Sequence, residues 1–116
     1  MTVIALRTRP PAWELLQHAI AEHKTVKAIY HGHERLLCPH LLGWHHERAK
    51  LLAYQLTGTT STGPLNGDPR QRWRSMFVDE IEHAVITTDR WQTAPNYTAT
   101  AAGIDLIEVA VPLHRT

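Results

Sequence analysis

Residues 25–44 read TVKAIYHGHERLLCPHLLGW, two apolar stretches on either side of a glycine. In the first stretch, apolar residues recur at every second position from Val26 to Tyr30, which is the period of a strand with one face in the core. Gly32 then supplies the positive φ that a tight hairpin turn needs. The second stretch should bend at Pro39, because proline cannot donate a hydrogen bond in a central ladder. These residues therefore predict a β-hairpin.

A helix is expected upstream of this hairpin, over about residues 11–23. Trp13, Leu16 and Ile20 follow helical spacing and form one apolar stripe. Pro11 suits the first helical turn, where its missing N–H has no effect. A helix this short is not stable alone, so it should lie on an apolar surface of the rest of the chain.

Downstream of the hairpin, short segments of two-residue period alternate with loops rich in glycine and proline. The expected strands are 51–57, 73–78, 81–87 and 107–111, and the expected loops are 58–69 and 89–103. Such short strands are typical of a small barrel or sandwich. We therefore predict a mainly β (α+β) fold in one domain, residues 1–116, with a helix at about 11–23, a barrel at about 25–88, and a loop and terminal strand at 89–112.

Length and composition narrow the class of protein. A chain of 116 residues is too short for two ordinary domains, and 43% hydrophobic and 20% charged residues are usual for a globular protein. No apolar run approaches the roughly 18–20 residues of a membrane helix, and the single cysteine, Cys38, excludes an intramolecular disulfide. A cytoplasmic protein without a membrane partner is expected. Since the net charge is only +1, anion binding would need a local patch.

Residues 70–74 read RQRWR and form the strongest candidate for such a patch. If a strand begins here, Arg70, Arg72 and Arg74 project from one face and offer planar donor forks to a phosphate or carboxylate. Trp73 could stack on a base. The alternative is a charged edge strand with Trp73 in the core.

Nine histidines are unusual for a chain of this length. His40 follows a proline within an apolar stretch, where it could donate to an anion or bond a backbone carbonyl. The adjacent pair His45 and His46 lies in a predicted turn, and its side chains should point apart. We therefore expect neither a metal site nor a cofactor. No GxSxG elbow indicates a serine nucleophile, and no catalytic residue is expected.

Several segments together resemble the WYL family of bacterial ligand-sensing domains. The resemblance begins with LLQHAIAEHKTVKAIYHGHERLLCPHLLG at 15–43, continues with KLLAYQLTGTTSTG at 50–63 and WRSMFVDEI at 73–81, and covers about residues 15–100. The tripeptide that names the family corresponds to Ala49, Lys50 and Leu51, so only the leucine is retained.

The resemblance implies an SH3- or Sm-like five-stranded barrel, preceded here by one helix and followed by an extra strand. It also implies a non-enzymatic sensor in transcription regulation or phage defence, with a single-stranded nucleic acid or nucleotide as ligand. Family pattern and arginine cluster together predict seven ligand-binding residues: Tyr30, Arg35, His40, Tyr54, Arg72, Trp73 and Arg74.

Two other functions stay open. The chain could be an interaction module, in which a strand edge or residues 107–111 pair with a partner or with a second copy as a homodimer. It could also be a metal-independent phosphodiester-cleaving enzyme that uses His40 and Arg74 as an acid–base site.

Overall fold

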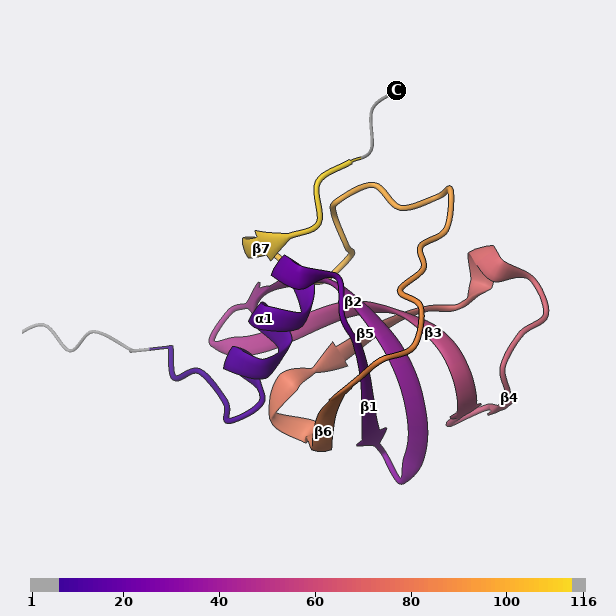
Figure 1. The fold of residues 1–116 in the computed structure, drawn as a ribbon. Helices are drawn as coiled ribbons and strands as arrows, with labels where there is room; N and C mark the ends of the chain where they lie inside the picture. Colours follow the sequence, from indigo (N-terminus) through magenta and orange to yellow (C-terminus); the bar gives the residue numbers. More distant parts are fainter. Residues whose placement is uncertain (1–6, 114–116) are drawn as a thin grey trace, which may run out of the picture.

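The computed structural model describes residues 7–113 and has one helix and a mainly β architecture (Figure 1). The helix α1 (Trp13–Glu22) precedes all the strands, and two short 3-10 helices, η1 (Pro69–Gln71) and η2 (Val78–Glu80), flank β5. The strands are β1 (Thr25–Tyr30), β2 (His33–His45), β3 (Arg48–Thr60), β4 (Gly63–Pro64), β5 (Trp73–Phe77), β6 (Ile81–Thr87) and β7 (Leu106–Ala110).

The strands form a seven-stranded antiparallel sheet that is not closed. Its path runs β4-β3-β2-β1-β6, and β5 also pairs with β3 while β7 pairs with β2. β7 pairs with residues Leu41–Trp44 of β2, beyond the part of β2 that pairs with β1. β5 and β6 are joined by η2 but share no ladder among the described residues, so closure into the predicted five-stranded barrel is not present as hydrogen-bonded pairing.

Most of the predicted elements are confirmed within a few residues. The hairpin turn has positive φ at both His31 (51°) and Gly32 (78°), as the mirror-image two-residue turns require. The irregularity expected at Pro39 is present: the register of β2 against β3 shifts between Pro39 and Leu41, and β2 continues beyond it as one strand. One prediction is wrong. The predicted loop 58–69 is partly strand, since β3 extends to residue 60 and then pairs with β4.

The main core lies between α1 and one face of the sheet, called here the inner face (Figure 1). Trp13 of α1 stacks on Trp44 of β2, with ring centroids 5.0 Å apart. The helix ends at Glu22, and the left-handed φ of 53° at the capping residue His23 lets the Lys24 backbone N–H donate back to the Ala19 carbonyl at 2.8 Å. Within residues 7–113, no helix has the length and apolar character needed to span a membrane.

Candidate functional site

The strand register divides the predicted site residues between the two faces of the sheet. Ala53 of β3 is opposite Arg74 of β5, and the next pair along the same two strands is Tyr54 with Trp73. Because successive side chains of a strand point to opposite faces, Arg74 and Trp73 cannot serve one site on the sheet. The seven residues therefore do not form a single patch.

Arg35 and Arg74 lie on the inner face, because their partners in β1 and β3 are core residues. Arg35 is only 4% exposed, its Nη2 donates to the Tyr30 carbonyl at 3.2 Å, and its guanidinium lies 5.3 Å from the centroid of the Tyr30 ring. Arg74 is part-buried, and its Nη1 donates to the Gln71 and Trp73 carbonyls at 3.1 and 2.9 Å.

The two guanidinium groups have no negative partner among the residues that the structure describes. No carboxylate of residues 7–113 forms an ion pair with either one. Burial lowers the pKa of Arg35, and the positive charge of Arg74 lowers it further; burial also lowers the pKa of Arg74. Within residues 7–113, the Nε atoms of both arginines and the Oε1 atom of Gln55 are buried without a hydrogen-bond partner. Arg35 and Arg74, called the arginine pair below, therefore form a partly buried positive site with unused donors.

Two contacts position the strands that carry the arginine pair. Gly58 of β3 is opposite Arg35, and a Cβ atom at residue 58 would lie 2.2 Å from the Glu34 carbonyl oxygen. Only glycine permits that close approach, at a φ of 104°. On the other side, the Tyr30 hydroxyl accepts a hydrogen bond from the backbone N–H of Phe77 at 3.0 Å, which links β1 to the end of β5.

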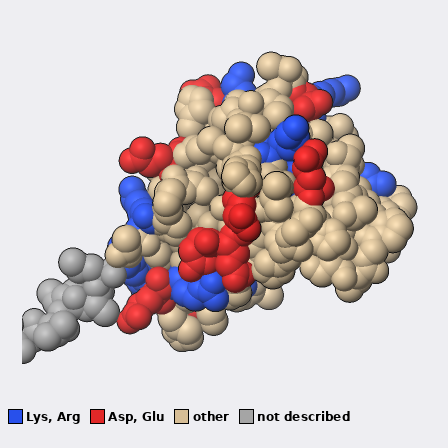
Figure 2. All heavy atoms as spheres, turned by 90° about the horizontal axis from the view of Figure 1, so that it is seen from below, with Lys and Arg blue, Asp and Glu red and all other residues tan. Residues whose placement is uncertain are grey.

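Charge elsewhere on the surface is mixed. In Figure 2, basic and acidic side chains lie beside one another on the face that is turned to the viewer, in agreement with the net charge of +1. Arg48 is an example, since it pairs with Asp79 at 2.7 Å and with Glu80 at 3.5 Å. The arginine pair differs from such surface arginines because Arg35 is buried, Arg74 is part-buried, and neither has such a partner among the described residues.

The opposite, outer face carries an aromatic cluster centred on His40. The imidazole is fully buried and stacks on Trp91 at 4.4 Å, with Trp73 and Tyr97 against its edges at 4.7 and 4.9 Å. Tyr54 contacts Trp73 at 5.3 Å. These side chains bring the loop between β6 and β7 down onto the sheet.

Both nitrogen atoms of His40 are engaged within this cluster. Burial lowers its pKa from 6.5 to about 4, so the ring is neutral at neutral pH. Nδ1 lies 2.7 Å from the Cys38 carbonyl, which can only accept, and therefore carries the proton. Nε2 then accepts from the Thr93 hydroxyl at 2.8 Å. Of the two roles open to His40 from sequence, the geometry matches the carbonyl bond.

Arg70 and Arg72 do not join Arg74 on a strand. β5 begins at Trp73, while Arg70 lies in η1 and has its Nε 3.7 Å from a carboxylate oxygen of Asp68. Arg72 donates through Nε to the Asn66 carbonyl at 2.8 Å. The expected row of three arginines is therefore wrong, because the chain turns through a 3-10 helix before the strand starts.

Sequence reasoning missed Trp91 and Gln55. Trp91 lies in a segment that is correctly predicted as a loop. The only signal in the sequence that this loop packs against the sheet is the large apolar ring of Trp91 itself. Beside it, a cavity of about 770 Å³ is lined by Trp91, Tyr97, Val111 and neighbouring residues, and a second of about 300 Å³ lies near Ser75. Neither is lined by the arginine pair. The Nε1 atom of Trp91, beside the larger cavity, is also buried without a hydrogen-bond partner among the described residues, but only the arginine pair adds positive charge that no described carboxylate neutralises.

Comparison with known proteins adds no relative: no family model, no curated protein and no solved structure matches this sequence. Functional inference therefore depends on the contacts of the side chains themselves.

Proposed function

We propose that this protein is a non-enzymatic ligand-sensing domain that binds a phosphate group of a nucleotide or single-stranded nucleic acid at Arg35 and Arg74. The observation that carries the proposal is that buried Arg35 and part-buried Arg74 lie on the inner face of the sheet, with no carboxylate partner among the described residues.

An anion between the two arginines would lower the free energy of the folded protein. Two like charges held close together in a partly buried place destabilise one another, and their unused N–H groups add the cost of unmade hydrogen bonds. An anion bound between them removes both penalties. The planar fork of arginine matches the oxygen atoms of phosphate, and charge-assisted hydrogen bonds are about twice as strong as neutral ones.

We also propose that the fold is a WYL-type domain. A WYL-type SH3- or Sm-like barrel in transcription regulation or phage defence is supported by the order of strands β5-β3-β2-β1-β6 and by η2 between β5 and β6. The hydrogen bond from Phe77 to Tyr30 also draws β5 toward β1 where the sheet is open.

The proposed site is smaller than the one expected from sequence. It keeps Tyr30, Arg35 and Arg74 and leaves out Tyr54 and Trp73, which point to the outer face. Without those rings, binding should depend on phosphate charge more than on base identity, and should weaken steeply with salt. His40 has both nitrogens occupied, so we propose no acid–base catalysis by it.

Fluorescence anisotropy with labelled single-stranded oligonucleotides at two salt concentrations tests this function. Arg74→Gln should weaken binding at least about tenfold, since it removes one charge-assisted contact. Arg72→Gln is the matched control, because it removes the same charge from an arginine outside the pair. Equal losses in both variants, or no binding of any oligonucleotide or nucleotide by the wild type, would reject the proposal.

A second candidate function is self-association through strand edges. Large apolar side chains are exposed by 38–48% on two strands, namely Val85 and Ile86 on β6 and Leu106 and Ile107 on β7. Sedimentation distinguishes this candidate: a stable dimer that ignores oligonucleotides favours an interaction module over a phosphate sensor.

A further inference from the structure

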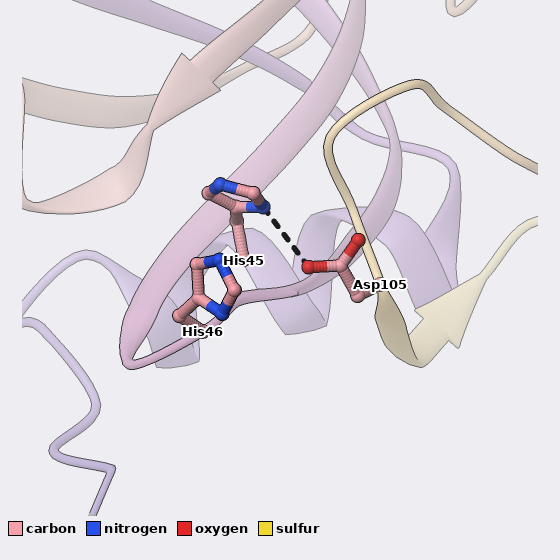
Figure 3. Close-up of side chains that lie close together, drawn as sticks. All are labelled: His45, His46 and Asp105. Atoms are coloured by element: carbon pink, nitrogen blue, oxygen red, sulfur yellow. Dashed lines mark hydrogen bonds and ion pairs between the residues drawn. The ribbon is translucent and has the colours of Figure 1, made fainter.

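A group of side chains of the types that ligate metals lies outside the arginine pair, where the end of β2 meets the start of β7. His45, His46 and Asp105 each offer one ligand atom, and these three atoms all lie within 4.8 Å of one another. The His45 Nδ1 atom and an Asp105 carboxylate oxygen are already 2.9 Å apart (Figure 3).

The sequence predicts that the side chains of the two adjacent histidines point apart, but in the structure they lie close together. The backbone conformation explains this difference. His46 occupies the left-handed region, with φ of 54°, at the first turn position after β2. This conformation turns its side chain back toward its neighbour, and the two imidazole centroids lie 4.4 Å apart. In Figure 3 both rings come from the same turn and lie on one side of it.

The carboxylate is brought to the turn by the sheet. The backbone N–H of Asp105 donates to the Trp44 carbonyl at 2.8 Å, and the next residue, Leu106, begins the pairing of β7 with β2. Asp105 is therefore fixed beside His45 by main-chain bonds, although the two side chains are 60 residues apart in sequence.

We propose that His45, His46 and Asp105 bind one Zn²⁺ ion. Two imidazole nitrogens and one carboxylate oxygen are a donor set that zinc accepts, whereas Ca²⁺ and Mg²⁺ prefer oxygen ligands alone. Tetrahedral zinc needs ligand atoms roughly 3.3 Å apart, given bonds of about 2.0–2.2 Å, so small side-chain rotations suffice. All three residues are partly or fully exposed, which leaves the fourth position open to water.

The ion would tie together parts of the chain that are distant in sequence. Its ligands come from the β2–β3 turn and from the segment that leads into β7, and that segment follows the loop that covers His40. Zinc would therefore anchor β7 and the loop to the sheet. Ligand binding to the folded state alone raises the unfolding temperature, so zinc should act as a stabilising clip.

Titration of the untagged protein with Zn²⁺, followed by calorimetry, tests the proposal. We expect one ion per chain, at least tenfold weaker binding in Asp105→Asn and His45→Ala, and a rise in unfolding temperature with zinc. His18→Ala is the matched control, because His18 is an exposed histidine on α1, away from the turn, and this variant should bind as the wild type does.

Co²⁺ in place of zinc gives a second readout, since a tetrahedral site produces intense visible absorption bands. His46→Asn keeps a residue that tolerates left-handed φ, so it should fold and lose this absorption. Circular dichroism confirms that each variant is folded. Unchanged zinc affinity in Asp105→Asn and His45→Ala, or no saturable binding by the wild type, would overturn the site.

Discussion

The hydroxyl of Tyr30 and the backbone N–H of Phe77 are joined by a 3.0 Å hydrogen bond that crosses between β1 and β5, two strands that share no ladder within residues 7–113. The Tyr30 side chain therefore links β1 to β5 where the sheet is open. The same Tyr30 also supports Arg35, through its ring and its carbonyl.

Tyr30→Phe should destabilise the protein by about 1–2 kcal/mol, because the part-buried Phe77 N–H is left without a partner. Urea unfolding measures the change. Tyr54→Phe is a suitable control, since Tyr54 is similarly buried but its hydroxyl has no hydrogen bond among the described residues. Equal losses in the two variants would contradict a specific role for the bridge.

Gly58→Ala should be strongly destabilising, by roughly 2–4 kcal/mol, because the added Cβ would collide with the Glu34 carbonyl and the φ of 104° strains any L side chain. Thermal unfolding measures it. Gly67→Ala provides the comparison, because a Cβ atom at residue 67 would have no atom within 4 Å, and the melting temperature of this variant should stay close to that of the wild type.

His40 should make stability fall as the pH is lowered. Its pKa is about 4 in the folded protein and 6.5 when unperturbed, so between these values the unfolded chain binds a proton that the folded chain does not. Stability is therefore lost from pH ~6.5 down to ~4, by at most about 3 kcal/mol. Urea unfolding across this range should show a shallower pH slope in His40→Asn; an unchanged slope would show that other groups are responsible.

Cys38 should be unreactive in the folded protein. Burial raises the pKa of its thiol to about 11, and its sulfur accepts a hydrogen bond from the Gln92 backbone N–H. A thiol reagent should therefore label the native protein far more slowly than the chain unfolded in guanidinium. Comparable rates in the two conditions would mean that the loop over the outer face opens readily.

Local signals in the sequence were sufficient for the helix and the hairpin. The apolar stripe of α1 and the Gly32 turn depend on neighbours within a few residues, and both are confirmed. Because side chains alternate along a strand, Trp73 and Arg74 have to point to opposite faces of the sheet. The sequence alone allows this inference, although the predicted site placed both residues together.

Long-range register was not predictable in the same way. Whether Arg35 shares a face with Arg74 depends on the bulge between Leu36 and Leu37, which shifts the pairing of β2 with β3 by one residue. The approach of Asp105 to His45 likewise depends on where β7 joins β2. No property of the individual residues sets these positions, because they follow from the packing of the whole sheet.

The opposite orientations of Trp73 and Arg74 make the protein sensitive to the length of the segment before β5. A slip of one position against β3 would carry the indole into the charged interior and the guanidinium into the aromatic layer. Insertions or deletions within 61–72 should be harmless only when Tyr54 and Trp73 stay aligned. Sequence changes in this loop are therefore limited by the pairing of Tyr54 with Trp73 more than by the identity of the loop residues.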